Sequence, residues 1–337
     1  MKKAKIIGCG ISGISSAIIL KNYDYDVEIF DTRYHIGGNC YDEKIDNITV
    51  HKYGSHIFHT NDRDVWSFLN RYTTFNNYVH KVRANTKYGL LSIPYNYLTK
   101  DQIGRDLTVE EIQKTIFIDY SERHWGLDWK NLPKHISNRL PQKRESYDDR
   151  YFLDTYQGIP SLGYTNMFNN MLDGIKINLQ IDKKYYKKLI DSNGIDIIIY
   201  TGKPDEYFDN IYGRLGYRSL VFEHSKTTKN NLFSFEKGAV INECNKMPFN
   251  RTADNSIFLN EKTQDTVLTR DYPVEHDDSN DPIYPKNFGN NLEIFAKYNK
   301  LMKLQNKTIF LGRLATYKYL DMWMAIKQVF QKFNYSP

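Results

Sequence analysis

One stretch decides the fold of this 337-residue chain: Ile6-Ile7-Gly8-Cys9-Gly10-Ile11-Ser12-Gly13, followed by the apolar run Val27-Glu28-Ile29-Phe30 and then Asp31. The glycines allow a tight turn and a close approach of the backbone to a pyrophosphate, whose charge the helix start stabilises. Asp31 lies 18 residues after Gly13, near the spacing of roughly 20 at which a carboxylate accepts from a ribose hydroxyl. The pattern predicts an adenine dinucleotide on a Rossmann-like domain, with NAD and FAD both open.

The residues after Asp31 favour a flavin over a nicotinamide. A second glycine pair, Gly37-Gly38, follows soon after the ribose acid and allows close approach to a ligand, and Arg33 could lie near a phosphate or over the adenine. Three histidines, His51, His56 and His59, then occur within nine residues. A metal would need further carboxylate or cysteine ligands at diagnostic spacing, so we expect no metal here but a loop that lines the cofactor.

Composition limits the class of protein. The net charge of +6 is spread along the chain, which favours a solvated basic surface or an anionic small substrate over nucleic-acid binding. The three cysteines lack disulfide or metal spacing and are expected to be reduced. The apolar run after Met1 is too short for a signal peptide, and no window reaches the roughly 18 apolar residues of a membrane span. We therefore expect a soluble, cytoplasmic protein with no membrane partner.

Periodicity predicts the other elements. We expect strands at 78–82 and 90–95, a helix from the capping box of Thr108 and Glu111 to Trp125, and an irregular segment from Gly126 to Pro141. We also expect a helix over 164–172, a buried strand at 195–200, antiparallel strands over 218–272, a strand at 307–311 and a closing helix over 321–333.

These elements predict an α/β fold with three parts. A discontinuous Rossmann-like FAD-binding domain is expected to comprise 1–75, 190–222 and 307–337. A short helical domain with a mobile substrate loop would span 95–140. An antiparallel β-sheet substrate domain would take 76–94, 141–189 and 223–306.

Eight motifs occur in one order: the glycine turn, His35-Ile-Gly-Gly-Asn-Cys-Tyr-Asp42, His51-Lys-Tyr-Gly-Ser-His-Ile-Phe-His-Thr60, Arg123-His-Trp-Gly-Leu127, Asp148-Asp-Arg-Tyr-Phe152, Thr201-Gly-Lys-Pro-Asp-Glu-Tyr-Phe208, Tyr217-Arg-Ser-Leu220 and Gly312-Arg-Leu-Ala-Thr-Tyr-Lys-Tyr-Leu-Asp-Met322. From residue 4 to about 330 the chain resembles prokaryotic UDP-galactopyranose mutases. The resemblance implies an isomerase that interconverts UDP-galactopyranose and UDP-galactofuranose on reduced FAD. In that family, flavin N5 attacks the anomeric carbon, UDP leaves, and the sugar opens through an iminium and recloses.

The resemblance also implies site residues. Arg139 and Arg251 match the arginines that hold the diphosphate, as guanidinium groups can do through paired bonds. The matching substrate residues are Phe117, Tyr120, Trp125, Arg139, Tyr151, Asn242, Arg251, Tyr284 and Tyr319. The matching cofactor residues are Gly8, Gly10, Ser12, Gly13, Asp31, Arg33, Gly38, Asn39, His56, Ile57, His59, Gly312, Arg313, Tyr319, Asp321 and Met322. We expect Arg139, Arg251, His59 and Tyr319 to be catalytic.

Some features depart from the family pattern. The helical region after Tyr97 is short, and because this region contributes to dimer contacts in the bacterial enzymes, a homodimer is left open. Another UDP-sugar, such as UDP-N-acetylgalactosamine or a pentose, would use the same chemistry. An amine-oxidase-like flavin oxidoreductase or a silent sugar-nucleotide-binding protein are the competing readings. The mutase would need an external reductant, such as NAD(P)H or a flavin reductase.

Overall fold

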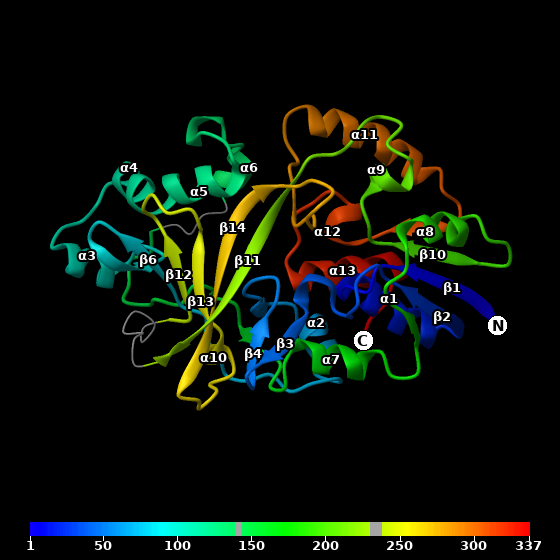
Figure 1. The fold of residues 1–337 in the computed structure, drawn as a ribbon, viewed down its shortest axis with the longest axis horizontal. Coiled ribbons are helices and arrows are strands. Elements are labelled where there is room, and N and C mark those ends of the chain that lie inside the picture. The colour runs from blue at the N-terminus through cyan, green and yellow to red at the C-terminus, as the bar shows by residue number, and fades with distance from the viewer. Residues whose placement is uncertain (139–142, 230–237) are drawn as a thin grey trace.

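The computed structural model describes residues 1–138, 143–229 and 238–337. A parallel and a mixed β-sheet lie side by side in it, and the long strands β11 and β14 of the mixed sheet lie on its side nearer the parallel sheet (Figure 1). No helix in these three ranges is long and apolar enough to cross a membrane.

A parallel sheet carries the N-terminal glycine turn. In the described part of the chain it has five strands in the order β16-β10-β1-β2-β9, which are Thr308–Phe310, Ile197–Tyr200, Lys2–Ile7, Tyr25–Phe30 and Lys176–Asn178. All neighbouring pairs are parallel, and parallel strands need cover on both faces. Ile6 packs in the core cluster that includes α1 (Ile11–Asn22) and α13 (Met322–Phe333), whereas Ile7 packs with Leu189 of α8 (Lys183–Ile190).

Further helices surround this sheet. They are α2 (Arg63–Leu69), α7 (Tyr164–Met171), α9 (Pro204–Tyr207), α11 (Asn290–Lys303) and α12 (Gly312–Ala315). Helix α7 contacts α1, α2 contacts α13, and α11 contacts α9 and β16. The contacts of α11 and α13 place the chain from Asn290 onward back on the parallel-sheet domain.

The other large sheet is mixed. Its seven strands in the described ranges follow the order β15-β11-β14-β13-β12-β6-β7: Tyr284–Pro285, Tyr217–Thr228, Asp265–Glu275, Arg251–Asp254, Val240–Glu243, Val82–Thr86 and Gly89–Ile93. Only the β12–β6 pair is parallel among them. Smaller pieces are β3 (Asp42–Ile45) with β4 (Ile48–His51), β5 (Phe58–Thr60) with β8 (Tyr156–Gly158), α10 (Asn255–Phe258) and the 3₁₀ turn η1 (Gly38–Cys40).

Short helices cover one end of the mixed sheet (Figure 1). They are α3 (Tyr97–Ile103), α4 (Val109–Ile112), the π-helical turn η2 (Gln113–Phe117), α5 (Ile118–Trp125), the 3₁₀ turn η3 (Trp129–Asn131) and α6 (Lys134–Ser137). The capping box is confirmed, because Thr108 Oγ1 accepts from the Glu111 amide at 3.2 Å and Glu111 accepts from the Thr108 amide at 2.9 Å. The turn η2 interrupts what the sequence predicts as one continuous helix.

Several predicted elements are confirmed, and others are wrong. The helices over 164–172 and 321–333 and the parallel strand near 195–200 are present. The strand expected at 78–82 starts only at Val82, because the His80 amide donates to the Gln157 side chain at 3.1 Å instead of to a strand. The segment expected to be irregular contains η3 and α6, and the pattern did not predict α8 or α11.

The expected domain boundaries also differ from the sheet pairing. Strand β9 joins the parallel sheet although 141–189 was expected in the substrate domain. Strand β11 starts inside the range 190–222 but pairs with β14 along its whole length. Helix α11, expected with the sheet domain, packs on α9 and β16. Pairing across distant segments decides these boundaries.

Candidate active site

The glycine turn between β1 and α1 forms a cradle that side chains cannot enter. A Cβ on Gly13 would lie 2.0 Å from the Gly8 carbonyl oxygen. Gly8 and Gly38 have φ values of +109° and +58°, in the region that favours glycine. A Cβ on Gly38 would lie 2.9 Å from Gly10 Cα. The backbones of the two glycine loops therefore lie against each other at the start of α1, with no side chain between them. Exposed backbone at a helix start fits the pyrophosphate of a dinucleotide.

Asp31 and Arg33 hold the end of β2. Asp31 accepts from the Cys9 amide at 2.6 Å and from the Arg33 amide at 2.9 Å, so its carboxylate fixes the glycine turn and the following loop together. The Arg33 guanidinium donates to Asn39 at 2.8 Å, pairs with Asp281 at 2.9 Å and lies 4.4 Å from the centre of the Tyr53 ring. Arg33 thus lies across this part of the site in a defined position.

A cavity of about 250 Å³ extends along this edge of the parallel sheet. Most predicted cofactor residues line it: Gly8, Gly10, Ser12, Gly13, Asp31, Arg33, Gly38, Asn39, His56, Gly312, Arg313, Asp321 and Met322. Thr201 and Lys203, which follow β10, and Lys183 and Tyr186 of α8 also line it. None of these four residues was predicted, although Thr201-Gly202 follows a predicted buried strand and could have been found there.

A second cavity, of about 380 Å³, adjoins the first, and Asn39, His56, Arg313, Asp321 and Met322 belong to both walls. Six predicted substrate residues line it: Tyr120, Tyr151, Asn242, Arg251, Tyr284 and Tyr319. Tyr120 belongs to α5, and Tyr151 lies in the segment before β8. Asn242, Arg251 and Tyr284 belong to β12, β13 and β15, and Tyr319 lies in the loop after α12. Ile57, His59 and Tyr319, predicted to bind the cofactor, lie in this second wall and not in the first.

Arg251 carries the positive charge of the second cavity. Its Nε donates to Asp271 at 2.6 Å, and its side chain is 25% exposed. Burial opposes the charged form, but the Asp271 carboxylate raises the pKa of Arg251 well above its usual value. Asn242 lies directly opposite Arg251 in the β12–β13 pair, and its buried Oδ1 has no partner among the described residues. The pair offers a fixed cation and an unused acceptor on one face of the sheet.

Aromatic rings and an arginine form another part of this wall. The Tyr284 and Tyr319 rings are parallel, with centres 5.9 Å apart. The Arg313 guanidinium lies 4.6 Å from the centre of the Tyr319 ring and donates to the Leu320 carbonyl at 2.7 Å. This stacking holds a second cation where the two cavities meet.

The histidines of the site are mostly neutral. Burial lowers the pKa of His56 to about 3, with His51 and Arg313 acting in the same direction, and burial lowers the pKa of His80 to about 3 as well. His80 was not predicted, although its position two residues before Val82 places it on the same face of the extended segment. In the three described ranges, no group of three or more His, Cys, Asp or Glu residues could hold a metal.

Three predicted substrate residues are not brought into the second cavity. Phe117, the last residue of the π-helical turn η2, is buried in the core at 7% exposure. Trp125 lies behind the wall, with its ring centre 6.2 Å from that of Tyr284. Arg139 lies outside the described residues.

The fold and the joined cavities define a dinucleotide-dependent enzyme with a flavoprotein-type architecture. A family model described as UDP-galactopyranose mutase matches residues 115–319, and one described as NAD(P)-binding Rossmann-like domain matches residues 6–72. The chain belongs to the UDP-galactopyranose mutase family. This membership confirms the predicted class, a flavin-dependent isomerase.

Individual proteins agree with this assignment. The chain is 34% identical to the dTDP-fucopyranose mutase of Escherichia coli, over 98% of this chain and 97% of that protein. It is 32% identical to the UDP-galactopyranose mutase of Mycoplasma genitalium, over 95% of this chain and 91% of that protein. The crystal structure of a reduced UDP-galactopyranose mutase has the same fold, with a TM-score of 0.75 at 14% identity over 99% of this chain and 93% of that chain. The structure of putrescine oxidase matches 99% of this chain and 98% of that chain, with a TM-score of 0.61 at 12% identity. This match shows a shared fold alone.

Proposed function

We propose that this chain interconverts UDP-galactopyranose and UDP-galactofuranose. The observation that carries the proposal is the position of Arg251, which is a partly buried cation in a cavity whose wall is shared with the first cavity. A cavity for an oxidase substrate needs no fixed cation, whereas a departing nucleoside diphosphate does. The cation and the cofactor then act on the same bound sugar nucleotide.

FAD is the cofactor that we propose for the first cavity. The bare backbone at Gly10 and Gly38 would hold its pyrophosphate, and Asp31 would accept from its ribose. When bound and reduced, it supplies a nucleophile for the anomeric carbon of the sugar. The residues around it contribute orientation and charge, and an external reductant such as NAD(P)H or a flavin reductase would keep it reduced.

The substrate residues would have separate roles. Arg251, with Arg139, would stabilise the diphosphate as it leaves and returns, since hydrogen bonds to charged groups contribute about 1.5–3 kcal/mol each. The hydroxyls of Tyr151, Tyr284 and Tyr319 would donate to its oxygens without adding charge. Asn242 Oδ1, buried without a partner among the described residues, would accept from the N–H of the base.

A second candidate substrate is dTDP-fucopyranose. The 34% identity to the dTDP-fucopyranose mutase of Escherichia coli over 98% of this chain favours it. Uracil and thymine present the same N–H to an acceptor such as Asn242, so this contact does not separate the two nucleotides. UDP-N-acetylgalactosamine and UDP-pentoses remain alternatives with the same chemistry.

The test is a substrate comparison. Dithionite-reduced protein is incubated in turn with UDP-galactofuranose and with dTDP-fucofuranose, and the pyranose forms are followed by chromatography. We expect conversion of UDP-galactofuranose with the larger kcat/KM. Faster conversion of the dTDP sugar would assign the second substrate, and failure to convert either with a reduced cofactor would refute the mutase proposal.

We also propose a cytoplasmic location, which the three buried, unpaired cysteines support. Burial raises the pKa of Cys9, Cys40 and Cys244 to about 12 in each case, so all three are protonated thiols. The oligomeric state is best measured by sedimentation, and a homodimer remains one of its outcomes.

A further inference from the structure

The imidazole of His59 is held on two sides in the wall of the second cavity. Its Nδ1 lies 2.9 Å from Asp154 Oδ2, and its ring stacks on the Phe152 ring with centres 3.6 Å apart and planes within 10°. The side chains of His59 and Asp154 are 14% and 22% exposed. The ring therefore has one defined orientation.

The carboxylate of Asp154 is itself held in place. Its Oδ1 accepts from the Asn61 amide nitrogen Nδ2 at 3.0 Å, and Asn61 Oδ1 accepts from the Thr155 backbone amide at 2.8 Å. His59 lies opposite Gln157 in the short β5–β8 pair. Backbone pairing and a closed side-chain network thus join two segments that lie 95 residues apart in the sequence.

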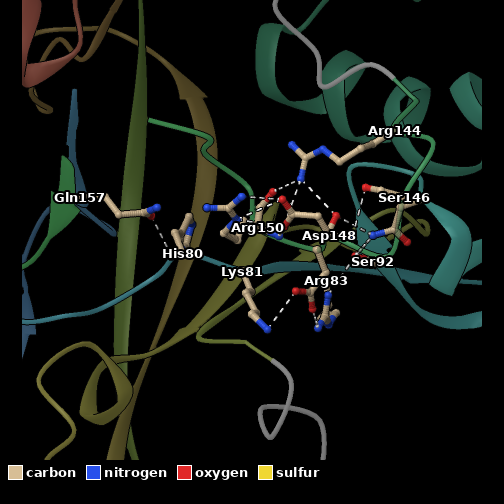
Figure 2. Close-up of polar contacts among 11 residues, drawn as sticks. His80, Lys81, Arg83, Ser92, Arg144, Ser146, Asp148, Arg150 and Gln157 are labelled. Carbon is tan, nitrogen blue, oxygen red and sulfur yellow. Dashed lines mark hydrogen bonds and ion pairs between the residues drawn. The ribbon is translucent and has the colours of Figure 1, made fainter. Parts of the chain in front are cut away.

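The segment that carries Phe152 and Asp154 is anchored to the mixed sheet. Just before it, Asp148 binds the Arg150 guanidinium, and Arg144 donates to the backbone carbonyl of Asp148 at 3.1 Å (Figure 2). The neighbouring carboxylate of Asp149 accepts from Arg83 at 2.6 Å and pairs with Lys81 at 2.9 Å. These contacts fix the segment from which Asp154 reaches His59.

This arrangement determines which nitrogen of His59 faces the ligands. A carboxylate that accepts at Nδ1 keeps the proton on that nitrogen. Nε2 then remains as the other ring nitrogen, and it has no partner among the described residues, although His59 lines the second cavity. In the neutral ring Nε2 is an acceptor.

We propose that Asp154 is a positioning residue of the mutase: it holds His59 with the proton on Nδ1, so that Nε2 accepts from a sugar hydroxyl. The proposal rests on the proposed function, because it takes the second cavity as the sugar site. In the proposed function the diphosphate is held by Arg251 of the same cavity and not by His59. Loss of the carboxylate should therefore lower kcat more than it weakens binding.

The first test compares Asp154→Asn with the matched control Asp64→Asn, which removes an acid with a 54% exposed side chain that pairs with Lys327. We expect Asp154→Asn to lower kcat at least tenfold while the Kd for UDP changes less than twofold, and Asp64→Asn to change neither. Equal losses in kcat and in UDP affinity would show a structural role instead and would overturn the proposal.

The second test is a double-mutant cycle. If Asp154 acts through His59, Asp154→Asn should have no further effect on kcat in a His59→Gln background. If the effects of the two substitutions on kcat multiply in the double variant, the two side chains act independently, and this would overturn the proposal. This test also separates a positioning role from a general loss of stability, which would persist in both backgrounds.

The third test does not depend on turnover. Ring ¹⁵N NMR of the cofactor-loaded protein, with the His59 signals identified from the His59→Gln spectrum, reports which nitrogen carries the proton. We expect the Nδ1–H form in the wild type and a shift toward Nε2–H in Asp154→Asn. An unchanged tautomer would overturn the proposal. If the protein converts neither sugar nucleotide, the proposed mutase function is refuted. The NMR measurement still decides whether Asp154 sets the tautomer of His59.

Discussion

At the scale of single residues, Arg251 is the cation that we propose for the substrate diphosphate. We expect Arg251→Ala and Arg139→Ala each to lower kcat/KM at least tenfold, because a tenfold loss corresponds to about 1.4 kcal/mol of lost diphosphate stabilisation. Steady-state kinetics with UDP-galactofuranose measure this loss. Arg105→Ala, which removes an arginine with a 53% exposed side chain, is the control. Near-wild-type rates in both site variants would show that the diphosphate binds elsewhere.

Two glycines of the cofactor turn should respond differently to alanine. Gly10 has an ordinary φ of −84° and no atom closer than 3.8 Å to an added Cβ, whereas at Gly13 that atom would overlap the Gly8 carbonyl at 2.0 Å. We expect Gly10→Ala to keep its melting temperature and lose cofactor affinity, because only the pyrophosphate needs the space. Gly13→Ala should lose both. Flavin absorbance and thermal melting measure the two effects, and full flavin content in Gly10→Ala would contradict the placement of the pyrophosphate.

At the scale of one element, α5 depends on a buried arginine from the mixed sheet. Arg218 donates to the carbonyls of His124 at 2.8 Å and of Arg123 at 3.1 Å, which would otherwise be unpaired at the helix C-terminus. We expect Arg218→Met to raise KM through Tyr120 on the same helix, with flavin content unchanged. Arg214→Met removes an arginine with a 67% exposed side chain and is the control. An unchanged KM would show that α5 keeps its position without this contact.

The helical segment from Thr108 to Trp125 contains one feature that the sequence predicts and one that it does not. The capping box at Thr108 was predictable, because it depends on two residues three positions apart. The π-helical turn η2 was not, because nothing in 113–117 departs from ordinary helical spacing. Tyr120 of α5 lines the cavity, whereas Phe117 at the end of η2 is buried in the core. Packing against the mixed sheet decides the phase of this helix.

At the scale of the whole molecule, buried neutral histidines should make stability depend on pH. Burial lowers the pKa of His51 from its ordinary value of 6.5 to about 4. Between pH 7 and 5 the unfolded chain binds a proton at this position and the folded chain does not, so stability falls as the pH falls. One such histidine contributes about 2 kcal/mol to the change over this range. His56, His80 and His124 act in the same direction.

His51→Asn tests this dependence, because His51 is 2% exposed and lies in neither cavity. Asparagine offers an oxygen in place of Nδ1, which accepts from the His56 amide at 3.1 Å. We expect the free energy of unfolding, measured in urea, to fall less between pH 7 and 5 in the variant than in the wild type. An equal fall in both proteins would contradict the assignment of a proton to this site.

The sequence by itself determined the local features of the protein. The cofactor turn is specified by three glycines, Gly8, Gly10 and Gly13, and by the acid Asp31. These residues lie close together in the chain, so their spacing alone predicts the turn, the start of the helix and the position of the acid. The order of the motifs was sufficient to predict the family. Most of the site residues that were predicted also line one of the two cavities.

Only the tertiary structure decided how distant segments combine. Strand β9 pairs with β2, strand β11 pairs with β14, and α11 packs on α9 and β16. Within the second cavity, Asn242 lies opposite Arg251, and His59 contacts Asp154. Each of these contacts joins parts of the chain that are separated in sequence. Such contacts depend on strand register and on the burial of faces, which no local pattern encodes. The sequence therefore determined the glycine turn, and the packing of the two sheets brought the second cavity to it.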